Sequence, residues 1–525
     1  MSLEQGAALL QGGRYHEALA LFRRLLAAEP QSVVARVGLA RAFLGTGDAL
    51  SCAAWLTDAA RLAPRQPEPT QQLADLLLAQ KLHAQAAPVY ARLLQDFGLR
   101  TPANLLHAGF CLEHTGELEQ AAALYREALA QQPDFMEAHV DLAGLLWRLE
   151  DFDGMLHHAQ RAVELAPRHP FAVRVLGTAW LNLNRVEDAE RELRRALALQ
   201  PAFALAELDL AFCLLLAGRL EEGWRWYELR WRDTDRLRRP AFWQPEREWA
   251  GPAQQPLAGQ AIAVYAEQGL GDVLQFIRYV PQLQAQGAAV HCVVQPELAS
   301  LVEASFPGVQ CLAPGRNVAV NLHVALLELP ARLGTCSVEA IPAQVPYLQP
   351  PEAARARWRE RLQPWAGTVK VGIAWSGSQV QVNNRNRAVP LSLLLPLVQQ
   401  PGVQGFSLQK GEAGPWSDVP LAGPALVDLT GEWHDFSDSA AMLEQLDLVI
   451  TVDTAVAHLA GALGKPVWIL LAPNADWRWL LAREDSPWYP TARLFRRGFG
   501  EPRAAQVGRV AEALSGWLPG RQGAA

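Results

Sequence analysis

Four segments of this 525-residue chain combine residue types that can bind an anion or move a proton. The first, Glu267–Arg278 (EQGLGDVLQFIR), places glycines and a carboxylate, Asp272, where a strand should pass into a helix. Glycines allow a ligand to approach the backbone, so Gly271 is a candidate phosphate contact. The segment is not a dinucleotide fingerprint, because Leu274 replaces the third glycine. Spacing leaves two interpretations of Asp272 open: an acid–base group at a strand end, or a helix cap.

The second segment, residues 375–391 (WSGSQVQVNNRNRAVPL), follows another apolar run. Ser376 and Gly377 offer a hydroxyl and free N–H groups. Arg385 and Arg387 add guanidinium groups, whose geometry matches phosphate oxygens. The chain is rich in arginine, so the two arginines are informative mainly because they follow a strand. We interpret the segment as a phosphate-binding loop.

The third segment, residues 407–412 (SLQKGE), also follows an apolar run and contains Lys410. The chain has only four lysines among its 47 basic residues. A lysine at a strand end is therefore a candidate functional group, although a solvated surface charge is the alternative.

The fourth segment, residues 446–471 (LDLVITVDTAVAHLAGALGKPVWILL), predicts a buried strand, an immediate helix and a second strand. Its candidate anion ligands lie where the first strand ends and the helix begins: Asp453, Thr454, Ala455 and Val456. N–H groups at that position favour a phosphate. His458 falls about one turn into the helix, where it is either a packing residue or a functional one.

The elements that must position these segments are parallel strands. Short apolar runs alternate with amphipathic stretches of helix length, which is typical of strands buried on both faces. Two doubly wound α/β lobes facing each other across a cleft are therefore expected. The expected strands are residues 261–266, 289–295, 318–330, 369–375, 404–409, 425–429, 446–452 and 465–472.

The first half of the chain is a repeat of 34 residues. Prolines that end apolar helical runs recur at this period, namely Pro30, Pro64, Pro133, Pro167 and Pro201, with Gly98 in the missing place. A column of mostly small residues is Ala18, Cys52, Ala86, Ala121, Met155, Ala189 and Gly223. Four positions later a mostly large column is Phe22, Leu56, Tyr90, Tyr125, Ala159, Leu193 and Tyr227. Helix–turn–helix units in which these columns meet predict an α-solenoid of about seven repeats. The expected turns are at Gly13, Gly47, Lys81, Gly116, Glu150, Asn184 and Gly218.

We expect four parts: the solenoid (1–235), a junction (236–258), a first α/β lobe (259–350) and a second α/β lobe (351–525). The junction region is rich in tryptophan, with five in 26 positions: Trp224, Trp226, Trp231, Trp243 and Trp249. These rings either form a binding surface or wedge the last repeat against the next domain. We favour wedging, because large aromatic side chains mainly supply buried area.

Composition excludes several other classes of protein. The chain is 50% hydrophobic and 19% charged, with a net charge of −7, which does not suit a nucleic-acid partner. Its six cysteines are too far apart for a zinc ribbon or a disulfide framework. The beginning of the chain does not resemble a signal peptide, and no uncharged apolar run approaches the ~20 residues that span a bilayer. We therefore expect a soluble cytoplasmic protein.

The strand–DTAVAHLAGALGKPVW–strand block and the GLGD turn resemble the heptosyltransferase-like glycosyltransferases. The 34-residue helical repeat resembles the tetratricopeptide repeat, and the combination is similar to bacterial tetratricopeptide-repeat glycosyltransferases, including enzymes that modify flagellin. The catalytic resemblance covers about residues 245–510. It implies a two-lobed, metal-independent enzyme of GT-B type that uses a nucleotide-sugar as substrate and no cofactor.

By this resemblance Asp272 is the general base, and residues 453–456 hold the donor diphosphate. Ser376, Gly377 and Lys410 correspond to donor-side positions. The resemblance thus makes 259–350 the acceptor-side lobe and 351–525 the donor-side lobe. The second segment departs from the H-x-N-D-R-N-R-S pattern of relatives at Gln381, Asn384 and Ala388, which puts activity or donor choice in question.

The expected function is inverting transfer of a sugar to a hydroxyl of an acceptor, with a flagellin-like protein captured by the repeat groove. Two alternatives remain. One is transfer to lipopolysaccharide or another glycan, and the other is a non-catalytic scaffold that keeps the two lobes.

Overall fold

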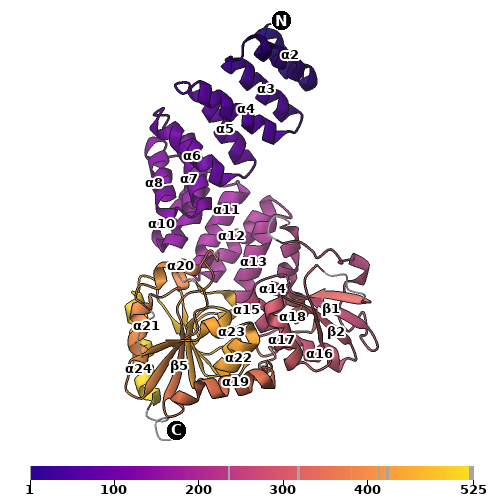
Figure 1. Ribbon diagram of the computed structural model, residues 1–525, viewed down its shortest axis with the longest axis vertical. Helices are drawn as coiled ribbons and strands as arrows, with labels where there is room; N and C mark the ends of the chain where they lie inside the picture. The colour runs from indigo at the N-terminus through magenta and orange to yellow at the C-terminus, as the bar shows by residue number, and fades with distance from the viewer. Residues whose placement is uncertain are drawn as a thin grey trace. The chain divides into compact units, whose positions relative to one another are not determined.

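The computed structural model describes residues 2–233, 237–315, 320–379, 381–411, 414–420 and 425–518. The chain divides into two compact units, residues 1–175 and 176–525. The boundary falls inside helix α11 (Pro170–Asn182). Figure 1 shows the helical segment in indigo to magenta and the two sheets in pink and orange.

Helices dominate the first unit and form antiparallel hairpins in chain order, as predicted (Figure 1). The helices before the boundary are α1 (Leu3–Gln11), α2 (Tyr15–Ala28), α3 (Val33–Gly45), α4 (Ala49–Leu62), α5 (Pro67–Ala79), α6 (His83–Gln95), α7 (Pro102–Thr115), α8 (Leu118–Gln131), α9 (Met136–Leu146) and α10 (Phe152–Leu165). The same pattern continues in the second unit with α12 (Val186–Leu199), α13 (Ala204–Leu216) and α14 (Leu220–Tyr227).

The repeat columns explain this packing. The residues of the large column are buried, as are those of the small column. Gly109 shows why small residues are needed, because a Cβ atom there would lie 2.7 Å from the Tyr125 ring. Every residue of the predicted turn column has a positive φ, including the non-glycine residues Lys81 (58°), Glu150 (60°) and Asn184 (58°). The predicted solenoid is therefore confirmed.

The first sheet contains four parallel strands in the order β3-β2-β1-β4. Its strands are β1 (Ala261–Tyr265), β2 (Ala289–Val293), β3 (Gln310–Leu312) and β4 (Leu322–Ala325). Its helices are α15 (Leu270–Phe276), α16 (Val280–Ala285), α17 (Pro296–Ser305) and α18 (Leu329–Arg332). The chain order reverses between β1 and β4, so a ligand crevice is expected at the carboxyl end of β1, where Asp272 follows.

The second sheet contains six parallel strands in the order β10-β9-β8-β5-β6-β7. Its strands are β5 (Val369–Ala374), β6 (Val403–Ser407), β7 (Leu426–Asp428), β8 (Leu448–Val452), β9 (Val467–Leu471) and β10 (Ala492–Arg496). Its helices are α19 (Glu352–Leu362), α20 (Asn384–Arg387), α21 (Leu391–Val398), α22 (Phe436–Glu444), α23 (Ala455–Ala462) and α24 (Arg503–Trp517). This is the doubly wound order, with its reversal between β5 and β8. The predicted solenoid followed by two α/β lobes is confirmed.

Two strands and one boundary differ from the sequence prediction. β3 and β10 were not predicted, because both lie at sheet edges and contain exposed polar residues that interrupt the apolar run. The apolar run 318–330 forms only the short strand β4, and the chain then turns into helix up to Arg332. Residues 318 and 319 lie outside the described part of the chain.

The tryptophans of the junction region pack rather than form a surface. Trp224 and Trp249 are buried, and the Trp224 indole N–H donates to the carbonyl oxygen of Thr335 at 2.9 Å. Trp231 and Trp243 pack on the face of the first sheet that includes Tyr265. The last repeat thus shares its core with the lobes, so the repeat pattern and the packing divide the chain at different places.

In the part of the chain that the structure describes, no helix combines the length and apolar character needed to cross a membrane.

Candidate functional site

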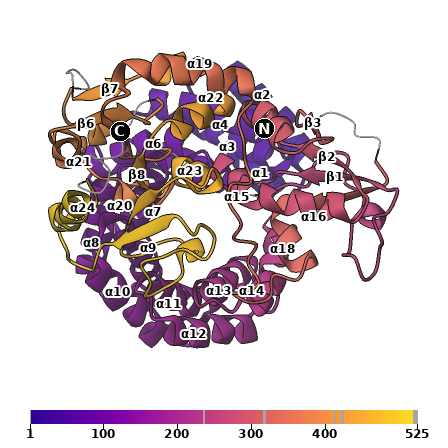
Figure 2. The ribbon, with the colours of Figure 1, turned by 90° about the horizontal axis from the view of Figure 1, so that it is seen from below.

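The site is built where two short helices from different lobes meet at their N-terminal ends. α15 follows β1 in the first lobe, and α23 follows β8 in the second. The two helices pack on each other, and Figures 1 and 2 both show them side by side. Two of the four predicted segments are therefore brought together by tertiary structure.

Glycine permits this contact. A Cβ atom on Gly271 would lie 3.0 Å from Cδ2 of His458 and 3.6 Å from Cα of Ala455. The structure thus places Gly271 and His458 in the seam between the lobes.

Asp272 is the third residue of α15, and its two carboxylate oxygens have different partners. Oδ2 accepts a hydrogen bond from the backbone N–H of Gly269 at 2.9 Å, which caps the helix. Oδ1 forms an ion pair with the guanidinium of Arg478. Burial raises the pKa of the Asp272 carboxyl, and the charge of Arg478 opposes the rise. The capping interpretation is confirmed, and the side chain, 20% exposed, can still meet a ligand.

The start of α23 has the geometry of an anion site. Thr454 is the N-cap residue, and its hydroxyl oxygen accepts a hydrogen bond from the N–H of Val456 at 3.2 Å. Asp453, Thr454, Ala455 and Val456 are all half-buried rather than enclosed. Burial raises the pKa of Asp453, and Arg387 counters this effect.

His458 lies one turn further along α23 and is buried. Its Nδ1 contacts the Tyr489 hydroxyl at 2.9 Å, and its ring stacks on Trp479 with centroids 5.5 Å apart. Burial, reinforced by the positive charge of Arg478, holds the pKa of His458 well below its ordinary value. His458 is therefore a neutral packing residue in this arrangement.

The loop after β5 is organised by Asn384. Its side-chain oxygen accepts from the N–H of Gly377 at 2.9 Å, and its amide donates to the Ser376 hydroxyl at 3.1 Å. Arg387 donates to the carbonyl oxygen of Asp453 at 2.6 Å, which ties this loop to the start of α23. The amide of Asn384 supplies a hydrogen-bond donor that an ionised aspartate lacks. Asn384, which differs from the pattern of the relatives, therefore stabilises this loop.

Arg385 and Lys410 each form a hydrogen bond with a residue outside the start of α23. Arg385 is exposed, and its carbonyl oxygen accepts from Arg503 at 2.7 Å. Lys410 is also exposed and donates to the carbonyl oxygen of Trp433 at 2.9 Å. Its neighbour Gln409 accepts from the N–H of Ser376 at 3.0 Å, which holds the loops after β5 and β6 together. Glu412, the last residue of the third segment, lies outside the described residues.

Sequence reasoning missed Arg478, which lies in the one-turn helix η9 (Trp477–Trp479) after β9. It contacts the predicted base directly, and only 9% of its side chain is exposed. The signal was the sequence DWRW in the loop after β9, in which Asp476 precedes Trp477 and Arg478 lies between Trp477 and Trp479. The abundance of arginine in this chain concealed it.

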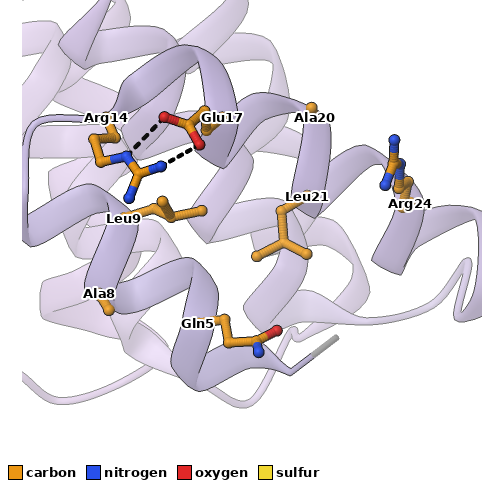
Figure 3. A pocket seen from close by; sticks show the side chains of 8 residues that line it. All are labelled: Gln5, Ala8, Leu9, Arg14, Glu17, Ala20, Leu21 and Arg24. Atoms are coloured by element: carbon orange, nitrogen blue, oxygen red, sulfur yellow. Dashed lines mark hydrogen bonds and ion pairs between the residues drawn. The ribbon is translucent and has the colours of Figure 1, made fainter.

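Among the described residues, no group of three or more His, Cys, Asp or Glu side chains is placed to hold a metal ion. One pocket of about 520 Å³ lies between α1 and α2, with the paired side chains of Arg14 and Glu17 at its wall (Figure 3). Another, of about 490 Å³, is lined by Leu216, Val338, Leu481 and neighbouring residues. Neither is lined by a predicted site residue.

The chemistry available at the seam is therefore specific. A carboxylate from one lobe lies near a helix N-terminus of the other, and arginines contact both. A carboxylate can remove a proton, and N–H groups with guanidinium charges can stabilise a phosphate.

Comparison with known proteins identifies the class. The glycosyltransferase family 9 (heptosyltransferase) model matches residues 425–496, which include the start of α23 and Arg478 but not Asp272. Tetratricopeptide repeat models match residues 9–54, 113–170 and 174–229. The chain thus combines tetratricopeptide repeats with a domain that matches the family 9 glycosyltransferase model.

One relative aligns with most of this chain. The protein FlbA of Caulobacter vibrioides is 28% identical over 518 residues, which cover 91% of this chain and 84% of FlbA. A tetratricopeptide-repeat protein of Treponema pallidum is 29% identical over 35% of this chain and 23% of its own length. Among solved structures, YrrB, a tetratricopeptide-repeat protein with an unusual peptide-binding site, aligns with 35% of this chain and 95% of its own at 16% identity (TM-score 0.31).

Proposed function

We propose that this protein is an inverting glycosyltransferase that moves a sugar from a nucleotide-sugar to a hydroxyl group of an acceptor protein. The observation that carries the proposal is the packing of α15, the helix of Asp272, against the first turns of α23 across the seam between the lobes. The family 9 match supports the chemistry, and the repeats support a protein acceptor.

In this proposal Asp272 removes the proton of the attacking hydroxyl as the new glycosidic bond forms. The bond from the anomeric carbon to the donor phosphate breaks at the same time, and the nucleotide leaves with its electron pair. Residues 454–456 and Arg387 stabilise the charge that gathers on the leaving phosphate. A single displacement inverts the anomeric centre.

The acceptor proposed is a flagellin-like protein held by the repeats in the cytoplasm. Solenoids of this kind offer an extended concave surface, which suits a long polypeptide better than a small molecule. The similarity to FlbA does not by itself define a substrate, so the acceptor rests on the repeat architecture and on the resemblance to flagellin-modifying enzymes.

The direct test is transfer from a panel of nucleotide-sugars to candidate acceptors by the full chain and by Asp272→Asn. We expect the variant to lose about 10²- to 10⁴-fold in transfer rate, the usual contribution of a general base. It should remain folded and still bind donor, which thermal shift measures. Asp485→Asn, an exposed carboxylate paired with Arg483, is the matched control. Normal turnover by Asp272→Asn would remove this residue from the mechanism.

The alternatives predict different outcomes. A non-catalytic scaffold would show neither donor hydrolysis nor transfer with any nucleotide-sugar. A glycan acceptor would be used equally well after removal of residues 1–168, whereas a protein acceptor would be lost while donor binding survives. The deletion should stop before α11 rather than at 235, because Trp224 and Tyr227 belong to the core of the lobes.

A further inference from the structure

The loop between β9 and β10 contains a backbone conformation that its residues do not favour. Leu480 has φ 52° and ψ −165°, and Ala482 has φ 51°. Neither residue is glycine, and such conformations persist where the surroundings hold them, often at functional sites. Arg478 lies in the same loop, two residues before Leu480.

Each nitrogen of the Arg478 guanidinium has a hydrogen-bond or ion-pair partner. Nε donates to Oε1 of Gln275 at 2.8 Å, Nη1 to Oδ1 of Asp476 at 2.9 Å, and Nη2 pairs with Asp272. Its carbon Cζ lies 4.3 Å from the centre of the Trp477 ring. Asp272 and Gln275 belong to the first lobe, so one side chain of the second lobe clamps two positions of α15.

The remaining contacts keep this clamp in place. Asp476 also accepts from the backbone N–H of Arg478 at 3.0 Å, which closes the one-turn helix. Trp477 packs against Trp224 and Phe276 with centroids 5.4 Å and 6.4 Å away. The guanidinium therefore has little freedom to leave, and Asp272 is held from both of its oxygens.

We propose that Arg478 is a positioning residue that holds the Asp272 carboxylate in the anionic form and in one orientation toward the acceptor. The inference rests on the proposed function, in which Asp272 is the base. A base must be both unprotonated and aimed at its proton, and the fork of Arg478 supplies both conditions. Lysine has a point charge without the fork, so it would supply the first condition better than the second.

The sign of the electrostatic effect follows from the groups around Asp272. The charged and titratable groups that interact with Asp272 are Arg478 and Asp476 from the loop after β9, Glu267 from the loop after β1 and Tyr227 from α14. From α23, His458 lies against the neighbouring Gly271. Arg478 provides the positive charge, while Asp476 and Glu267 are acidic. Loss of the Arg478 charge should therefore move the protonation midpoint of Asp272 to higher pH.

The first experiment does not depend on activity. The carboxyl ¹³C signal of Asp272, assigned by its absence in Asp272→Asn, is titrated in the full chain and in Arg478→Gln. A midpoint at higher pH in Arg478→Gln supports the proposal, and an unchanged midpoint overturns it. Arg483→Gln, an arginine of the same loop paired with Asp485 at 2.6 Å, should leave the midpoint unchanged.

The second experiment separates charge from geometry. In Arg478→Gln, kcat should fall about 100-fold, the cost of a misplaced group, and the acidic limb of the pH profile should move to higher pH. Arg478→Lys should restore the pH limb but only part of kcat. Arg478→Lys also provides the test if Arg478→Gln fails to fold. Wild-type kcat in Arg478→Lys would overturn the role of the fork.

The two proposals fail in different ways. If Asp272→Asn transfers sugar normally, the proposed mechanism fails, whatever Arg478 does. If Asp272→Asn is inactive while Arg478→Gln keeps the wild-type pH profile and kcat, the positioning role alone is wrong.

Discussion

Gly271 of α15 lies directly against His458 of α23, so close that a Cβ atom would stand 3.0 Å from the imidazole carbon Cδ2. His458 cannot easily retreat, because Trp479 stacks on one side of it and the Tyr489 hydroxyl contacts its Nδ1. The glycine of the GLGD turn therefore sets how closely the two lobes approach. The role that the structure shows for Gly271 is this close packing.

Gly271→Ala should separate the two helices slightly. We expect a loss of about 1–3 kcal/mol in the free energy of unfolding, the usual cost of overpacking, together with a lower transfer rate. Chemical denaturation and the transfer assay measure the two effects. Gly508→Ala is the control, because Gly508 lies in α24, exposed, with open space around its Cα. That variant should be stabilised by about 0.5–1 kcal/mol, and equal effects of the two substitutions would contradict the packing argument.

Arg387 and Arg385 should contribute differently to donor binding. Arg387 donates to the carbonyl oxygen of Asp453 beside the proposed phosphate site, whereas Arg385 is exposed. We expect Arg387→Gln to weaken donor binding about 10-fold or more, the value of one charge-assisted hydrogen bond, and Arg385→Gln to weaken it less. Calorimetric titration with the best nucleotide-sugar gives both constants. A larger effect at Arg385 would show that the donor phosphate binds elsewhere.

Asn184 connects a repeat turn to the donor-side lobe. It has φ 58°, and its amide donates to the carbonyl oxygen of Pro473 at 2.8 Å. Asn184→Gly keeps the turn conformation and removes only the amide, so a loss of about 1 kcal/mol is expected. Asn184→Ala should cost about 1 kcal/mol more, because alanine does not favour a positive φ. Thermal unfolding of both variants measures which is less stable. Identical stabilities would contradict a separate cost of the positive φ for alanine.

Glu267 makes stability depend on pH. Burial, against the opposing charge of Arg230, raises the pKa of Glu267 from 4.5 to about 7. The folded protein then holds a proton that the unfolded chain has released, so this contribution to stability is complete below pH 4.5 and is lost as pH rises through 7. Glu267→Gln cannot ionise. From pH 4.5 to pH 8, its stability relative to the wild type should therefore rise by up to about 3 kcal/mol.

Urea denaturation at several pH values tests this prediction. Glu297→Gln, at the exposed start of α17, is the comparison variant that removes a surface carboxylate. A constant difference between wild type and Glu267→Gln across this range would mean that Glu267 is ionised throughout in the folded protein.

Periodicity and local chemistry in the sequence determine much of this protein by themselves. The repeat columns predicted which residues are buried and which turn residues adopt positive φ, because a helical hairpin depends on contacts within about 34 residues. The apolar runs predicted most strands for a similar reason. A central parallel strand must be apolar on both faces, whereas the edge strands β3 and β10 lack a continuous apolar run.

Tertiary structure decided the composition of the site. Asp272 and Arg478 are 206 positions apart, and nothing local to either residue indicates that they pair. The same holds for Gly271 with His458, and for Arg387 with the Asp453 carbonyl. Sequence spacing could nominate a carboxylate, a helix start and several arginines. Only the packing of α15 on α23, and of the loop after β9 on both, selected which of them meet, because that choice depends on how two separately folded sheets fit together.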